Sequence, residues 1–260
     1  MLRPTDWECS LYDEVADHEN KDAFKKLKKE YSDFFKFLKN VTGYEKVGFG
    51  KAASLNNLNR EVRFSFDSPT LFTAAYSGVV ILLIVEVKIK IIHHLPQPDW
   101  VYKRWPEHDN QTTLEIVTEL KRIERVSEFD SPDKARLRGG LLLGDWVSRA
   151  VNISNGKVVQ PQKMNLYSTH EGTVASLMYA FGIGDGTLIP YAACLIMEVY
   201  QTPKGGTVVK LLYKNQTDQN YLHNTIIPGC QEFCPVKKLK KLLADMIIDD
   251  DDELVEQERV

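Results

Sequence analysis

A histidine and a carboxylic acid stand side by side in the turn Thr169-His170-Glu171-Gly172, and they are the clearest candidates for chemistry in this chain. A histidine at such a place can contact an anion, and a carboxylic acid can give a proton to a departing group. The preceding residues, Met164–Ser168, have the pattern of a short buried strand. The following residues, Thr173–Phe181, carry apolar side chains at helical spacing, which predicts a helix.

A strand that enters a helix through a short polar turn places that turn at the carboxyl edge of a sheet. Ligands of open α/β sheets bind in the crevice at this edge. The helix N-terminus there has N–H groups without helical partners and a partial positive charge, which suits phosphate. The alternative interpretation is purely structural: Thr169 and Glu171 cap the helix, and His170 packs or forms a hydrogen bond.

Further motifs surround and follow this turn in a definite order. They lie in Tyr167–Val174, Leu188–Cys194, Glu198–Tyr200, Tyr213–Asn215 and Pro228–Pro235. The order resembles the C-terminal half of the histidine acid phosphatases of the prostatic and lysosomal type. That family has a Tyr-Ser-x-His-Asp-x-Thr turn, a Pro-Pro-Tyr-Ala-x-Cys segment and a Pro-Gly-Cys-x-x-x-Cys-Pro loop. A run of motifs in the right order is more specific than any one of them.

The resemblance implies an α/β fold, namely a phosphoglycerate-mutase-like histidine phosphatase core with a helical cap subdomain. Only the C-terminal portion of the family is matched, so the core is expected to be partial and to lack its N-terminal half. We expect residues 1–135 to form the cap portion, interrupted by an atypical apolar insertion at about 63–93. Residues 136–248 are expected to form the C-terminal part of the core, and residues 249–260 an acidic, disordered tail.

Members of the resembled family hydrolyse phosphate monoesters through a phosphohistidine, while an acid protonates the departing alkoxide. Their nucleophile and two phosphate-binding arginines come from an Arg-His-Gly-x-Arg-x-Pro motif. None of the six histidines here is followed by Gly-x-Arg-x-Pro. The resemblance assigns phosphate contact to His170 and proton donation to Glu171, in place of the usual aspartate. Glutamate is one methylene longer, which puts its role as proton donor in doubt. Because a proton donor without a nucleophile leaves the chemical step unaided, we expect little or no catalysis from this sequence as written.

The expected function is therefore that of an acid phosphatase family member with an incomplete site, as in a fragment. One alternative is a non-catalytic secreted glycoprotein that binds phosphate-bearing ligands. Another is a truncated product without a function. The expected partners are a phosphate monoester or inorganic phosphate and a second copy of the chain in a homodimer, with no cofactor.

Charge and composition argue against several other classes of protein. The net charge is −3 and the sequence pI is about 6.1, which does not favour a nucleic-acid partner. Hydrophobic residues make up 43% of the 260 residues, enough for the core of one or two domains. His93 and His94 have no third ligand near them in the sequence, so no metal is expected.

Two features indicate passage through the secretory pathway. N-glycosylation acceptor sites begin at Asn40, Asn110, Asn152 and Asn215. Cys230 and Cys234 lie close enough, in a Pro- and Gly-bounded loop, to form a disulfide. Together with the resemblance, these features predict a secreted or lysosomal protein. Residues Met1–Trp7 carry no apolar signal-peptide region, and we expect that an N-terminal stretch is missing.

The remaining pattern predicts the elements that position the turn. Amphipathic helices are expected over 22–39, 112–129, 136–150 and 235–248, and a hairpin over 194–200 and 207–213. Gly139-Gly140 lacks the Gly-Lys-Ser/Thr ending of a phosphate loop, and close packing of a helix against a sheet is expected to explain it. Cys9 and Cys194 resemble family positions that form disulfides, but the expected partners of both are absent from this sequence.

The segment Arg63–Ile92 departs from the family resemblance. Its part Leu71–Val85 is apolar and rich in β-branched residues, but it is shorter than the roughly 20 residues of a membrane span. A buried strand or hairpin, a marginal membrane segment and a foreign insertion all remain open. Because the resemblance resumes at Leu95, we hypothesise that residues at about 63–93 are translated intron or a gene-model error. A membrane is not an expected partner.

Overall fold

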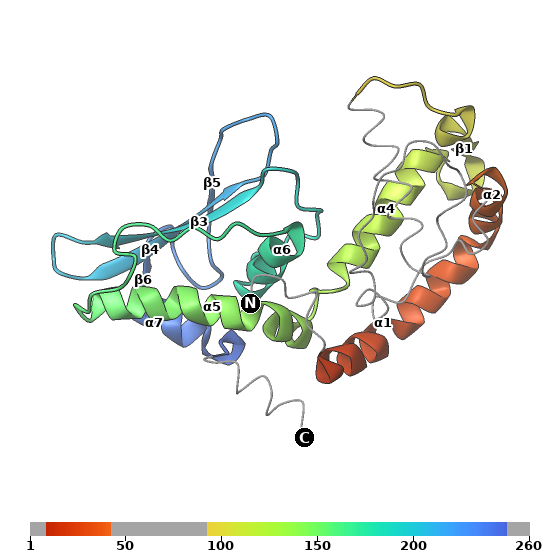
Figure 1. Ribbon diagram of the computed structural model, residues 1–260. Helices are drawn as coiled ribbons and strands as arrows, with labels where there is room; N and C mark the ends of the chain where they lie inside the picture. Colours follow the sequence, from red (N-terminus) through yellow and green to blue (C-terminus); the bar gives the residue numbers. More distant parts are fainter. Residues whose placement is uncertain (1–8, 43–92, 249–260) are drawn as a thin grey trace. The chain divides into compact units, whose positions relative to one another are not determined.

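The computed structural model describes residues 9–42 and 93–248. Within these residues the chain is an α/β protein, in which helices accompany a four-stranded sheet and a small two-stranded one (Figure 1). The chain divides into two compact units. One comprises Met1–Val15 with Glu128–Val260, and the other comprises Ala16–Ser127. The atypical segment Arg63–Ile92 and the expected acidic tail at 249–260 lie outside the described residues.

The unit formed by Ala16–Ser127 is mainly helical. It contains most of α1 (Ser10–Glu30), together with α2 (Ser32–Thr42) and α4 (Thr113–Val126). The helix predicted over 22–39 is divided at Tyr31, although the Tyr31 N–H still donates to the carbonyl oxygen of Leu27 at 2.9 Å. The apolar stripe of the sequence becomes the core of this unit, which contains Phe34, Phe35, Leu38, Trp105, Ile116, Val117 and Leu120.

Short elements lead into α4 and fix its start. They are the 3-10 helices η2 (Asp99–Tyr102) and η3 (Pro106–His108) and the antiparallel strands β1 (Arg104–Trp105) and β2 (Gln111–Thr112). α4 then begins with a capping box. The Thr112 hydroxyl oxygen accepts from the Glu115 N–H at 3.2 Å, and the Glu115 carboxylate accepts from the Thr112 N–H at 2.7 Å. These bonds satisfy backbone groups that a helix end leaves without partners.

The four-stranded sheet of the other unit is antiparallel. β3 (Cys194–Gln201) and β4 (Thr207–Lys214) form the predicted hairpin, with Glu198 opposite Lys210. β5 (His223–Thr225) and β6 (Cys234–Pro235) both pair with β4. The hairpin turn closes because the Thr202 N–H donates to the Gly206 carbonyl oxygen at 2.8 Å. Gly205 has a φ of 80° in this turn, a conformation that costs little only for glycine.

Three helices accompany this sheet: α5 (Pro132–Ser154), α6 (Glu171–Ala180) and α7 (Val236–Leu242). α5 and α7 lie along the same side of the sheet and contact each other and β4 (Figure 1). Alternate residues of β4 point toward these helices, as the period of two in a strand requires. The resulting core contains Leu142, Leu143, Val147, Leu177, Phe181, Val209, Leu211, Cys234 and Leu239.

Gly139 and Gly140 allow close packing of α5, but the partners differ from those that the sequence predicts. A Cβ on Gly139 would overlap the carbonyl oxygen of Ser176 and lie 2.8 Å from the Cβ of Ala180, both on α6. A Cβ on Gly140 would lie 2.6 Å from the carbonyl oxygen of Met246. The prediction that these glycines pack a helix against a sheet is therefore wrong, because their close contacts are with α6 and the C-terminal segment.

The helix predicted over 235–248 is shorter in the structure. α7 ends at Leu242, and a 3-10 turn, η4 (Ala244–Met246), follows it. Leu242 is 42% exposed, whereas Leu239 and Ile248 are fully buried. The Ile248 N–H donates to the carbonyl oxygen of Gly140 at 3.2 Å, so the described end of the chain is fixed across α5.

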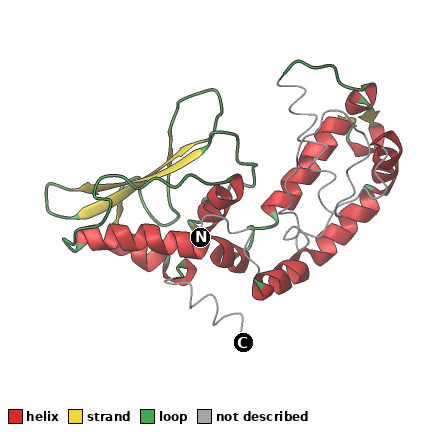
Figure 2. Ribbon diagram, in the orientation of Figure 1, coloured by secondary structure: helices red, strands yellow, loops and turns green. Residues whose placement is uncertain are grey.

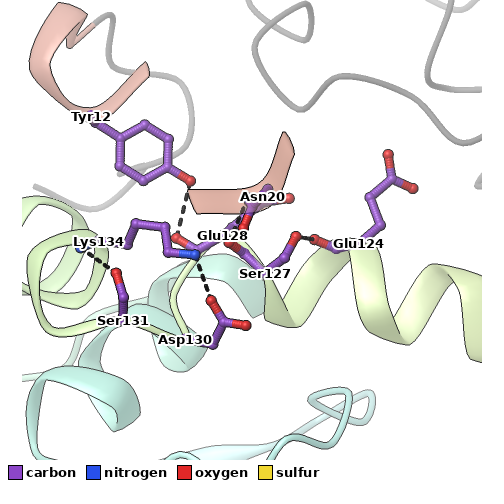
Figure 3. A network of polar contacts seen from close by, with 8 residues as sticks. All are labelled: Tyr12, Asn20, Glu124, Ser127, Glu128, Asp130, Ser131 and Lys134. Atoms are coloured by element: carbon purple, nitrogen blue, oxygen red, sulfur yellow. Dashed lines mark hydrogen bonds and ion pairs between the residues drawn. The ribbon is translucent and has the colours of Figure 1, made fainter. Parts of the chain in front are cut away.

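Polar contacts fix the chain where α5 begins (Figure 3). The Tyr12 hydroxyl donates to the Glu128 carbonyl oxygen at 3.0 Å, and burial raises the pKa of this phenol above its ordinary value. The Lys134 ammonium, on a side chain that is only 2% exposed, pairs with Asp130 at 2.5 Å. The Ser131 hydroxyl oxygen caps α5 by accepting from the Lys134 N–H at 3.3 Å.

Candidate functional site

The turn Thr169-His170-Glu171-Gly172 lies at the N-terminus of α6. His170 is the N-cap residue, with extended backbone angles of φ −117° and ψ 165°, and the helix begins at Glu171. The His170 carbonyl oxygen accepts the first helical hydrogen bonds, from the N–H groups of Thr173 (3.1 Å) and Val174 (3.3 Å). The first amides of any helix have no partner within it and point out of its N-terminus, which is the arrangement that binds anions.

The two candidate side chains differ in exposure. His170 is exposed, and its imidazole makes no capping hydrogen bond. Glu171 is half-buried in the first turn of α6. The Thr169 hydroxyl bonds to the hydroxyl of Thr173 at 2.8 Å. An imidazole open to solvent, a carboxyl group and a helix N-terminus thus lie together, and such a set can bind an anion and supply a proton.

The segment before the turn is not the buried strand that the sequence predicts. The segment between α5 and α6 is a loop throughout (Figure 2), and Met164–Ser168 pair with no strand among the described residues. Met164 and Leu166 are 73% and 77% exposed. The prediction rested on apolar side chains, but a strand also needs a neighbour that accepts and donates its backbone hydrogen bonds. The described part of the chain places none beside this segment.

Side chains of α5 hold this loop instead. The Tyr167 hydroxyl donates a short hydrogen bond to the Asp145 carboxylate. The Asn165 side-chain amide donates to the Tyr167 hydroxyl oxygen at 2.6 Å. Burial, and then the hydrogen bond to Asp145, raise the pKa of Tyr167 to about 12. The phenol therefore keeps its proton, and remains a donor, at neutral and acid pH.

Arg149 makes a second contact with the loop, one helical turn further along α5. Its guanidinium donates to the carbonyl oxygens of Gln160 and Pro161 at 2.9 and 3.0 Å. Neither Asp145 nor Arg149 was identified from the sequence. Asp145 and Arg149 are opposite charges four residues apart, a spacing typical of an exposed ion pair along a helix. The sequence pattern therefore gave no indication that both side chains contact a loop.

The predicted disulfide between Cys230 and Cys234 is confirmed. Cys234 is buried in the core and belongs to β6, which pairs with β4. The bridge therefore ties the Pro- and Gly-bounded loop to the sheet. Cys9 and Cys194 form no disulfide and remain as thiols.

The four glycosylation acceptor residues have different surroundings. Asn40, Asn110 and Asn215 are exposed, and Asn110 lies in a turn with a φ of 57°. Asn152 is half-buried near the end of α5. A glycan is bulky and needs a surface position, so the three exposed residues fit this modification better than Asn152.

Residues 9–42 and 93–248 contain neither a candidate metal site nor a helix that could span a membrane. No three His, Cys, Asp or Glu side chains among them are grouped so that they could hold a metal ion. His93 and His94 are exposed residues of a turn. No helix described in this part of the chain has the length and apolar character needed to cross a membrane.

The fold and the turn agree with the match to one protein family. The family model of the histidine phosphatase superfamily (branch 2) matches residues 7–214, and the chain belongs to this family. The family and the α/β fold class that the sequence motifs implied are thereby confirmed.

Particular relatives include acid phosphatases of two kinds. Prostatic acid phosphatase of Mus musculus is 31% identical over 231 residues, which cover 87% of this chain and 54% of the mouse protein. The Rattus norvegicus protein of the same name is 34% identical over 163 residues, or 61% of this chain and 39% of that protein. Lysosomal acid phosphatase of Xenopus laevis is 27% identical over 168 residues, with 61% and 35% covered. The chain spans about half the length of these curated relatives, or less.

Proposed function

We propose that His170 and Glu171 form the phosphate-contact and proton-donor part of a histidine acid phosphatase site, whose substrates are phosphate monoesters. Family membership and relatives named as acid phosphatases support this role. The observation that carries the proposal is the position of His170 at the N-cap of α6, with its imidazole exposed and making no capping bond. Glu171 follows it directly in the first helical turn.

The proposed reaction has two steps. A nucleophilic histidine attacks phosphorus, the bond from phosphorus to the ester oxygen breaks, and Glu171 gives its proton to that oxygen, so that an alcohol leaves. His170 and the N–H groups at the start of α6 stabilise the phosphoryl oxygens. Water then attacks the phosphorus of the phosphohistidine, the bond from phosphorus to the histidine nitrogen breaks, and the proton of the water passes to the Glu171 carboxylate, so that inorganic phosphate and the free histidine are released.

The 260-residue sequence carries only part of this machinery, because none of its histidines stands in a His-Gly-x-Arg-x-Pro motif. We therefore expect this chain by itself to bind phosphate without hydrolysing esters.

The replacement of aspartate by glutamate is expected to lower the rate even when a nucleophile is supplied. It moves the carboxyl group by about one methylene, and a misplacement of about 1 Å can cost roughly 100-fold in rate.

A second candidate function is phosphate binding without catalysis, in a secreted or lysosomal glycoprotein. The exposed imidazole of His170 favours it, because an exposed cationic or hydrogen-bonding group can contact phosphate without any chemical step. We further propose glycans at Asn40, Asn110 and Asn215, and a homodimer. The intact mass of protein from a secretory host, before and after glycosidase treatment, tests the glycans. Light scattering tests the homodimer.

Two measurements on the purified chain test the proposal, and turnover, if it is found, separates the candidates. Hydrolysis of an aryl phosphate reports turnover, and line broadening of the ³¹P signal of inorganic phosphate reports binding. We expect binding that His170→Ala removes, and no turnover. Turnover that Glu171→Gln abolishes would show a complete active site and rule out the non-catalytic candidate. Absence of binding by the folded chain would contradict both.

A further inference from the structure

We propose that Asp145 and Tyr167 are positioning residues that hold His170 in the place where it meets phosphate. This role rests on the proposed function, but neither residue touches phosphate or moves a proton. The two side chains form a tether, defined here as the hydrogen bond from the Tyr167 hydroxyl to the Asp145 carboxylate.

The chain before His170 needs such a tether. Met164–Ser168 pair with no strand in the described residues, and the side chains of Met164 and Leu166 are exposed. No backbone ladder among the described residues fixes the stretch that leads to the turn, and of the three apolar side chains there only Tyr167 packs against the core. Segments with few buried contacts lie at the low end of local stability and open easily.

α5 contacts the chain on both sides of His170. Three residues before it, the Tyr167 ring lies 6.0 Å from the ring of Trp146, and the Tyr167 hydroxyl bonds to Asp145. After it, Ser176 of α6 lies against Gly139, with no room for a side chain between them. The N-cap is thus held between two contacts with one helix. Because α6 is fixed by its own packing, loss of the tether is expected to displace His170 more than Glu171.

Both partners have the chemistry that a permanent tether requires. Asp145 offers a carboxylate, and hydrogen bonds to ionised acceptors are shorter and stronger than neutral ones. The phenol of Tyr167 keeps its proton over the whole acid and neutral range, so it can always donate a hydrogen bond to Asp145. Asn165 also donates to the phenol oxygen, at 2.6 Å, and keeps the hydroxyl group oriented toward Asp145.

The experiment compares two tether variants with a matched control. Tyr167→Phe removes the donor but keeps the ring beside Trp146, and Asp145→Asn keeps the shape but removes the charge. Tyr200→Phe is the control, because it removes a 2.5 Å bond from a tyrosine hydroxyl to the Glu198 carboxylate on the sheet of the same unit. Each variant is checked for folding by thermal unfolding. The readouts are the phosphate dissociation constant from ³¹P titration and the imidazole ¹³C NMR signal of His170 without phosphate.

The tether variants are expected to weaken phosphate binding roughly tenfold, by analogy with the loss of residues that orient metal ligands, which costs about 10–100-fold in affinity. They are also expected to shift or broaden the His170 signal. The double variant should bind as weakly as either single one, because the two residues act as one pair. Tyr200→Phe should change neither readout. If Asp145→Asn does not fold, Tyr167→Phe, which removes a single oxygen atom, gives the same comparison.

The opposite result is equally clear. Folded tether variants whose His170 signal and phosphate affinity match the wild type would show that the bond only stabilises the fold, and they would overturn the proposal. If the wild-type chain binds no phosphate, the proposed function fails, but the His170 signal needs no ligand and still decides whether the tether holds the turn.

Discussion

Gly139 of α5 and Ser176 of α6 approach so closely that a Cβ on Gly139 would overlap the Ser176 carbonyl oxygen. This contact sets how near the two helices come. α6 carries His170 at its N-cap, and α5 carries Asp145, which bonds to Tyr167 just before the turn. The spacing of the two helices therefore affects the site as well as the core.

Gly139→Ala is expected to destabilise the protein by about 1–3 kcal/mol, because the added methyl group overpacks the contact between α5 and α6. Helix propensity alone predicts the opposite sign, a gain of about 1 kcal/mol. Urea unfolding measures the difference. Ser148→Ala is the control on an exposed position of the same helix, where a change within about 0.5 kcal/mol is expected. Stabilisation by Gly139→Ala would mean that the two helices are not in close contact.

The capping box of α4 predicts an acid-dependent loss of stability. The hydrogen bond from the Thr112 backbone, and next that from its hydroxyl, hold the pKa of Glu115 below its ordinary value. The folded pKa is thus the lower one, so this contribution is present above the ordinary value of 4.5 and is lost as the pH falls below it. Glu115→Gln should remove that dependence in unfolding measured from pH 6 to pH 3, a range of about three units around the usual glutamate pKa.

Two variants accompany this measurement. Thr112→Ala should cost about 1 kcal/mol at neutral pH, as loss of an N-cap usually does. Glu107→Gln removes the charge of an exposed glutamate in the same unit, for which the described residues show no bond, and should leave the acid dependence unchanged. An equal effect of both glutamate variants would point to net charge and not to the capping box.

Alkaline pH should destabilise the unit that carries the site. Burial raises the pKa values of Tyr167 and Tyr213 to about 12, with further contributions from the hydrogen bond to Asp145 and the charge of Asp185. Because the folded values lie above the unfolded value of about 10, stability is complete below that pH and falls as the pH rises toward 12. Unfolding at several alkaline pH values measures this slope. Tyr167→Phe should reduce it, whereas Tyr191→Phe, at a 67% exposed position of the same unit, should not.

The disulfide between Cys230 and Cys234 closes a short loop, so its contribution to stability is expected to be modest. Loop-closure entropy for about five residues corresponds to about 2 kcal/mol. Replacing both cysteines by alanine should lower the free energy of unfolding by that amount. A reducing agent should destabilise the wild type similarly and leave the double variant unchanged. If the reducing agent affects both proteins equally, the bridge is not the cause.

Local sequence patterns correctly predicted the elements that are determined by residues close together in the sequence. The hairpin of β3 and β4 combines two alternating strands with a turn that contains Gly205, and α4 combines an apolar stripe with Thr112 at its start. Met164–Ser168 were predicted wrongly, since a strand depends on a neighbouring strand, which local sequence does not reveal, and the described residues place none beside this segment. The extent of α7 was also misjudged, because a 3-10 turn replaces its last helical turns.

In the candidate site, too, residues in a contiguous motif were predicted and residues with distant partners were not. His170 and Glu171 were identified because the motif around them is contiguous and stands in order with others. Asp145 was not, because its partner Tyr167 lies 22 residues away and no local pattern links them. The partners of Gly139 were likewise set by which helix lies against α5, and the sequence carries no signal for that choice.

The central claim is that His170 at the start of α6 contacts phosphate, and titration of the chain with inorganic phosphate followed by ³¹P NMR tests it most directly. His18→Ala is the matched control, since His18 is an exposed histidine on α1. We predict saturable binding in the wild type and in His18→Ala, and loss of binding in His170→Ala. Unchanged phosphate binding by folded His170→Ala would contradict the assignment.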